Sequence, residues 1–69
     1  MEALVATITR EIIELRPRVL VTFRIQTTSG LYTYPVTIEN QGNDTANEAL
    51  ARRELSKILQ EVLEALGPA

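Results

Sequence analysis

Strict alternation of apolar and polar residues is the clearest pattern in this chain, and it occurs on both sides of Gly30. The alternating apolar positions are Val19, Val21, Phe23 and Ile25 before the glycine, and Tyr32, Tyr34, Val36 and Ile38 after it. A period of two places successive side chains on opposite faces of a strand. The sequence therefore predicts an antiparallel β-hairpin over 18–39 with one buried face.

The register of this hairpin follows from matching its two apolar sets, because residues opposite each other in a sheet share a face. Pairing Phe23 with Val36 makes this match, with either a two-residue loop, 29–30, or a four-residue loop, 28–31. With the shorter loop, Pro35 would fall in a hydrogen-bonded pair although it has no N–H to donate. We therefore predict the four-residue loop, with the strand that contains Pro35 at an outer edge of the sheet.

The C-terminal third of the chain has a helical period. Its apolar residues recur three and four positions apart, which predicts a helix over 45–66; they are Ala51, Leu55, Ile58, Leu59, Val62, Leu63 and Leu66. Thr45 and Glu48 fit a capping box at the start of this helix, and Gly67 followed by Pro68 marks its end. Such a helix is about 33 Å long and could cover the whole hairpin. We therefore expect the stripe to form core rather than a helix–helix interface.

The N-terminal segment fits two patterns. One face of an α-helix over about 2–15 would be apolar, and Pro17 would end that helix; the face consists of Leu4, Val5, Ile8, Ile12 and Leu15. A β-branched run over 5–9 and the lack of a good N-cap favour a strand instead. We predict the helix. The expected fold is thus α+β in the order α-β-β-α, with both helices packed on one face of the hairpin.

This order leaves the outer edge of the first hairpin strand, 19–27, without a partner. Free N–H and C=O groups at a sheet edge recruit other strands, and Arg24 is the only charge on this one. The N-terminal segment, a second copy of the chain or a different protein could pair there. We expect the second copy, which would extend the sheet to four strands in a homodimer. The predicted interaction edge consists of Val19, Val21, Phe23, Arg24 and Ile25.

Composition adds weight to association. The chain of 69 residues has no Cys and no His, so neither disulfides nor the best transition-metal ligands can stabilise this small single domain over 1–69. No apolar stretch approaches the roughly 20 residues that span a bilayer. The N-terminus carries Glu2 where a signal peptide would be basic, so we expect a cytoplasmic protein that does not bind membranes.

Catalytic and ligand-binding patterns are absent from the sequence. Without His or Cys there is no evident nucleophile–base pair, and most carboxylates fall on polar helix faces. The polar loop over 40–44 lacks the alternating ligands of a calcium-binding loop. We therefore expect no enzyme activity, no cofactor, no metal and no small-molecule substrate.

The expected function is that of a non-catalytic protein-interaction module, a small structural, assembly or regulatory subunit acting through its free strand edge. Its partner would be itself or another protein. One alternative is nucleic-acid binding by Arg16, Arg18 and Arg24, the last two on the face opposite the core. A net charge of −2 and the lack of stacking aromatics on that face disfavour it. A third hypothesis is a small acidic inhibitor of a larger enzyme, which would dock through the same edge or through the C-terminal helix.

Overall fold

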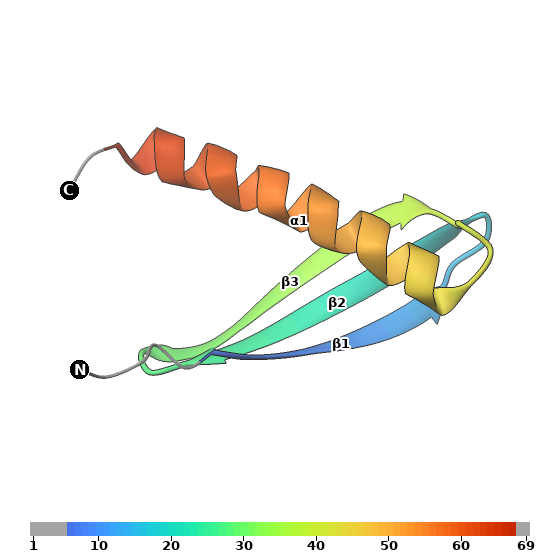
Figure 1. Cartoon of the computed structure of the whole chain (residues 1–69), viewed down its shortest axis with the longest axis horizontal. Coiled ribbons are helices and arrows are strands. Elements are labelled where there is room, and N and C mark those ends of the chain that lie inside the picture. Colours follow the sequence, from blue (N-terminus) through green and yellow to red (C-terminus); the bar gives the residue numbers. More distant parts are fainter. Residues whose placement is uncertain (1–5, 68–69) are drawn as a thin grey trace.

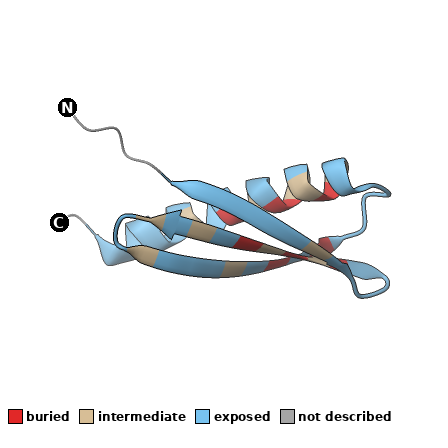
Figure 2. Ribbon diagram, turned by 90° about the horizontal axis from the view of Figure 1, so that it is seen from below, coloured by how far each residue is buried: buried red, intermediate tan, exposed pale blue. Residues whose placement is uncertain are grey.

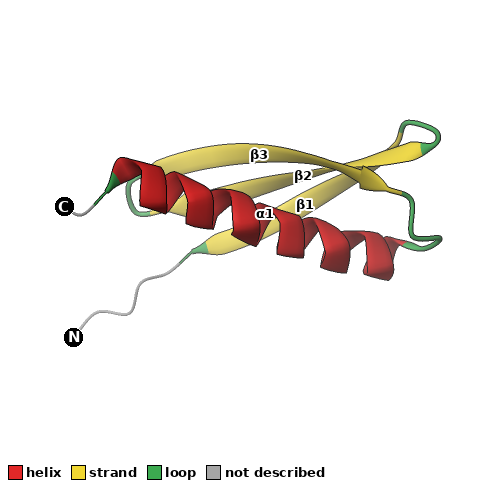
Figure 3. Cartoon of the chain, turned by 90° about the horizontal axis from the view of Figure 1, so that it is seen from above, coloured by secondary structure: helices red, strands yellow, loops and turns green. Residues whose placement is uncertain are grey.

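The chain folds as a three-stranded antiparallel sheet followed by one long helix, and the computed structural model describes residues 6–67 (Figure 1). The elements are β1 (Thr7–Glu14), β2 (Arg18–Thr27), β3 (Gly30–Glu39) and α1 (Asp44–Leu66). The strands are ordered β1-β2-β3, and α1 crosses one face of the sheet (Figure 3). This is an α+β fold of the order β-β-β-α.

The predicted α-β-β-α order is therefore wrong, because the segment over 7–14 is a strand and not a helix. The first residues of the predicted helix, 2–5, lie outside the described residues. Ile8 and Ile12 are four positions apart, a spacing that puts them on one face of a helix and equally on one face of a strand. Pairing decides between the two, since β1 occupies the edge of β2 that a helix would have left open.

The hairpin lies where its alternation predicts, but its register differs by two residues. Phe23 faces Tyr34 rather than Val36, and the loop is the two-residue turn 28–29 rather than 28–31. Gly30 follows this turn at φ 147°, in a region that favours glycine. A shift of two residues keeps every side chain on its predicted face. The apolar faces therefore match in both registers, and the turn selects the observed one.

The core is small and gathers under the first half of α1 (Figure 2). Its buried apolar residues in the described chain are Val19, Val21, Phe23, Val36, Ile38, Ala51 and Leu55. Arg52 lies above the Phe23 ring, with its guanidinium carbon 5.8 Å from the ring centroid. Burial along the helix fades at Leu59, which is half-buried, and the residues after it are exposed. The helix thus covers only part of the sheet, contrary to the expectation that it covers the whole hairpin.

The start of α1 is capped by Asn43, whose side chain accepts a hydrogen bond from the N–H of Ala46 at 2.8 Å. The predicted capping box of Thr45 and Glu48 is wrong. Asn43 stands two residues earlier and satisfies one of the free N–H groups itself, while Glu48 takes part in ion pairs. Gly67 ends the helix at φ 76°. Within the described part of the chain, no helix has the length and apolar character needed to cross a membrane.

Candidate interaction surfaces

The outer edge of β1 presents a regular row of backbone groups. Leu15 donates its N–H to the carbonyl of Arg18 at 2.8 Å, which makes these two residues a hydrogen-bonded pair. Hydrogen-bonded and non-hydrogen-bonded pairs alternate along an antiparallel ladder. Along the β1–β2 register, the odd-numbered residues of β1 are therefore the ones whose backbone N–H and C=O groups point toward β2. The residues that direct their N–H and C=O groups outward are Ile8, Arg10, Ile12 and Glu14.

The outer edge of β3 is different because a proline interrupts it. Pro35 lies opposite Thr22, and the same alternation directs the backbone of odd-numbered β3 residues away from β2. Pro35 thus has no N–H at the position where an added strand would need one. The prediction that the strand containing Pro35 lies at an outer edge is confirmed. Of the two edges, only that of β1 is free of proline, and it also lacks lysine.

The residues predicted as a free edge lie in the central strand instead. β2 pairs with β1 on one side and with β3 on the other. Val19, Val21 and Phe23 are at most 1% exposed, and Ile25 is half-buried. The predicted open edge over 19–27 does not exist in this fold, and a four-stranded sheet made by pairing two copies of β2 has no free edge to form through.

The arginines considered for nucleic-acid binding are accompanied by carboxylates. Arg24 and Arg18 do share the sheet face opposite the core. The Arg24 Nη2 atom lies 3.3 Å from Glu11 Oε1, and Arg18 stands opposite Glu39 across the β2–β3 ladder. Arg16 Nε lies 3.7 Å from an oxygen of the Glu14 carboxylate. The structure brings together a face of mixed charge, which gives a phosphate backbone little net attraction.

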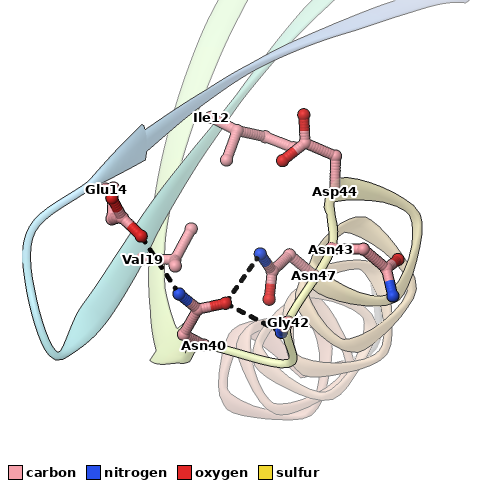
Figure 4. A pocket seen from close by; sticks show the side chains of 8 residues that line it. All are labelled: Ile12, Glu14, Val19, Asn40, Gly42, Asn43, Asp44 and Asn47. Carbon is pink, nitrogen blue, oxygen red and sulfur yellow. Dashed lines mark hydrogen bonds between the residues drawn. The ribbon is translucent and has the colours of Figure 1, made fainter.

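A polar pocket lies where β1 meets the loop before α1 (Figure 4). It is lined by Ile12, Glu14, Val19, Asn40, Gly42, Asn43, Asp44 and Asn47. Asn47, only 4% exposed, accepts the N–H of Gln41 at 2.7 Å, and Asn40 Oδ1 accepts the N–H of Gly42 at 2.9 Å. Among residues 6–67 no buried side-chain polar atom lacks a partner, and no group of three or more acidic residues could hold a metal. The amides of this pocket hold the loop in place.

An ion-pair network ties β1 to the helix. Arg10 Nε lies 2.6 Å from one oxygen of Glu48, and Arg52 Nε lies 2.9 Å from the other. The hydrogen bond from Arg10, followed by that from Arg52, lowers the pKa of the Glu48 carboxyl below its ordinary value. This network joins the edge strand to the first turns of α1.

The helix α1 and the sheet diverge toward the C-terminal end of the helix (Figure 1), and several apolar side chains are exposed in this part of the chain. On the helix, Ile58 is 43% exposed, Val62 47%, Leu63 65% and Leu66 76%. On the sheet, Ile8, Ile25 and Tyr32 form one row on the face that α1 crosses. We call these seven residues the open apolar end. The expectation that the helical stripe is core therefore fails at Ile58 and at every position beyond Leu59.

No protein family, curated protein or solved structure matches this chain.

Sequence reasoning missed the residues of the β1 edge, although a signal for them was present. The residues of this edge are spaced by two; they are Ile8, Arg10, Ile12 and Glu14. The β-branched run over 5–9, which is typical of a strand, leads into them. Read with period two, they predict an edge strand with Ile8 and Ile12 facing the core. The same residues also fit the four-residue spacing of a helical face, and that reading was preferred.

Proposed function

We propose that this chain is a non-catalytic protein-interaction module that associates through the outer edge of β1, with a second copy of itself as the partner. The observation that carries the proposal is the contrast between the two edges of the sheet. Pro35 interrupts the edge of β3, whereas β1 offers an unbroken row of outward N–H and C=O groups. Natural sheets guard such edges with proline, with charged side chains, lysine above all, or with a covering element, and an edge that lacks proline and lysine can take up an added strand.

Two-fold pairing of β1 with β1 of a second copy satisfies this edge. Outward-facing residues must meet each other, which restricts the two-fold to a few registers. Centring the pair on Ile12 sets Ile12 opposite its own copy and Arg10 opposite Glu14 of the second copy. Opposite charges facing each other in a ladder are favourable. The result is a continuous six-stranded sheet that carries both helices on one face.

Self-association also addresses the limited core of the monomer. Domains of this size rarely gain enough stability from one core, and oligomerisation is a common addition where disulfides and metals are lacking. The paired Arg and Glu residues of the opposite face give nucleic-acid binding no comparable support.

Matched proline substitutions test the proposal. Arg10→Pro removes an outward N–H in the middle of the β1 edge, and Thr33→Pro removes one from the β3 edge. Arg10→Ala removes the ion pair with Glu48 but leaves the N–H. By sedimentation at micromolar concentration we expect dimers for the wild type, Thr33→Pro and Arg10→Ala, and a monomer for Arg10→Pro that keeps its circular dichroism spectrum. A monomeric wild type, or a dimeric Arg10→Pro, would overturn the proposal.

A further inference from the structure

The outward residues of the β1 edge include two opposite charges. Arg10 and Glu14 stand on either side of Ile12, each two positions away from it. All three lie opposite buried residues of β2, so their side chains are on the face that α1 crosses. A strand added to this edge would meet both charges on that face. The edge therefore presents a charge pattern together with its backbone N–H and C=O groups.

Each of these charges is held by a group at or just before the start of α1. Glu48 Oε1 lies 2.6 Å from the Nε of Arg10, and a guanidinium has further donors on its terminal nitrogens. Asn40 Nδ2 donates to Glu14 Oε2 at 3.3 Å (Figure 4), and a carboxylate can accept several hydrogen bonds. The Arg10 and Glu14 side chains are still 39% and 55% exposed. Both are thus positioned and remain accessible to a partner.

The charges discriminate between the registers in which two β1 edges can pair about a two-fold axis. Centring the pair on Arg10 sets two arginines opposite each other, and centring it on Glu11 does the same with two glutamates. Like charges directly opposite each other are destabilising in a sheet. Centring the pair on Ile12 sets each Arg10 opposite Glu14 of the other copy. Of the registers centred on residues 8–14, this is the one that pairs opposite charges.

We infer that the β1 edge selects its partner by charge, with Arg10 and Glu14 as the residues that determine specificity for a second copy of the same chain in the register centred on Ile12. This rests on the proposed pairing of β1 edges and adds how one edge recognises another. The terminal nitrogens of Arg10 donate to Glu14 of the other copy. A strand that carries like charges at these positions is rejected.

Neutral and reversed charges have different consequences for this recognition. Arg10→Ala leaves an uncharged position opposite Glu14, so the backbone pairing persists. A reversed charge sets like charges opposite each other at two places related by the two-fold axis, which opposes the pairing itself. Charge reversal is therefore the change that tests specificity.

Glu14→Arg is the first variant to measure, with Glu61→Arg as its matched control. Glu61 is an exposed residue of the helix, so its reversal changes the net charge equally without touching the β1 edge. By sedimentation we expect the dimer dissociation constant of Glu14→Arg to be at least about ten-fold higher than that of Glu61→Arg. Added sodium chloride should weaken the wild-type dimer and strengthen that of Glu14→Arg, because it screens attraction and repulsion alike. Equal constants and equal salt responses would overturn the inference.

Mixing two reversed variants gives a second test. Arg10→Glu and Glu14→Arg each oppose like charges when alone, whereas a mixed dimer pairs opposite charges at both places. Native mass spectrometry distinguishes the two homodimers from the heterodimer by mass. We expect the heterodimer to predominate, and a statistical mixture of folded variants would overturn the inference. If Arg10→Glu loses its circular dichroism spectrum, the salt response of Glu14→Arg decides.

These results separate the charge inference from the edge proposal. A monomeric Arg10→Pro together with a Glu14→Arg that dimerises like Glu61→Arg would support the edge and overturn its selection by charge. A monomeric wild type would overturn both.

Discussion

Arg10 Nε lies 2.6 Å from Glu48 Oε1, so a contact across 38 residues joins the first strand to the beginning of the helix. Arg52, one turn further along α1, holds the second oxygen of the same carboxylate at 2.9 Å. The Glu48 carboxylate thus links the middle of β1 to the first turns of α1. The ladder with β2 holds β1 itself in place, and its outer edge faces away from both β2 and β3.

The Glu48 network predicts a loss of stability in acid. The pKa of Glu48 is lower in the folded chain than in the unfolded chain. The ionised carboxylate therefore stabilises the fold at any pH above the pKa of an unfolded glutamate, about 4.3. This contribution disappears as the pH falls through the folded pKa. Glu48→Gln should be less stable than the wild type near neutral pH, and the difference should shrink as the pH falls below the ordinary pKa of a glutamate, about 4.3. Urea unfolding at several pH values measures this; a constant difference across the range would contradict it.

Asn43 should contribute more to the helix start than Thr45. Asn43→Ala removes the acceptor for the Ala46 N–H and should lower the free energy of unfolding by about 1 kcal/mol. Thr45→Ala touches an exposed side chain of the first turn and should change it by less than about 0.5 kcal/mol. Denaturant titration of both variants under one buffer condition gives the comparison. The reverse order would mean that Thr45 is the cap.

Pro35 should act as the guard of the β3 edge. Pro35→Thr places an outward N–H and a good strand former there, so it should create a second edge that can accept a strand. We expect concentration-dependent species larger than those of the wild type, detected by light scattering. Adding Thr33→Pro moves the guard by two residues and should reverse the effect. A Pro35→Thr variant with the size of the wild type would show that this edge is closed by other means.

The alternation around Gly30 was sufficient to predict the hairpin and the buried face of each strand. It could not determine the register, because pairing Phe23 with Val36 or with Tyr34 buries the same side chains. The register depends on the backbone conformation of the turn. Gly30 has a positive φ there, but a glycine at this position is compatible with the predicted loop as well as with the observed one. An alternating pattern cannot distinguish registers that differ by two residues, because such a shift leaves every side chain on the same face.

The N-terminal strand could not be read from local pattern alone. The spacing of Ile8 and Ile12 fits one face of a helix as well as one face of a strand. Whether this segment is helix or strand is therefore determined by its tertiary pairing with β2. Predicting a helix in place of β1 also misplaced the candidate site, because the free sheet edge that was assigned to β2 is the outer edge of β1. Likewise, Arg24 was placed on the correct face, but its contact with Glu11 depends on the β1–β2 register. The sequence alone did not reveal that register.

Hydrogen exchange of individual backbone amides tests the central proposal most directly. The outward amides of Arg10, Ile12 and Glu14 should be protected by pairing with a second copy, and their protection should rise with protein concentration. Those of Thr33 and Thr37, on the edge of β3 that Pro35 interrupts, should exchange quickly at every concentration. Fast exchange of all five amides at every concentration would show that the β1 edge remains unpaired and would contradict the account.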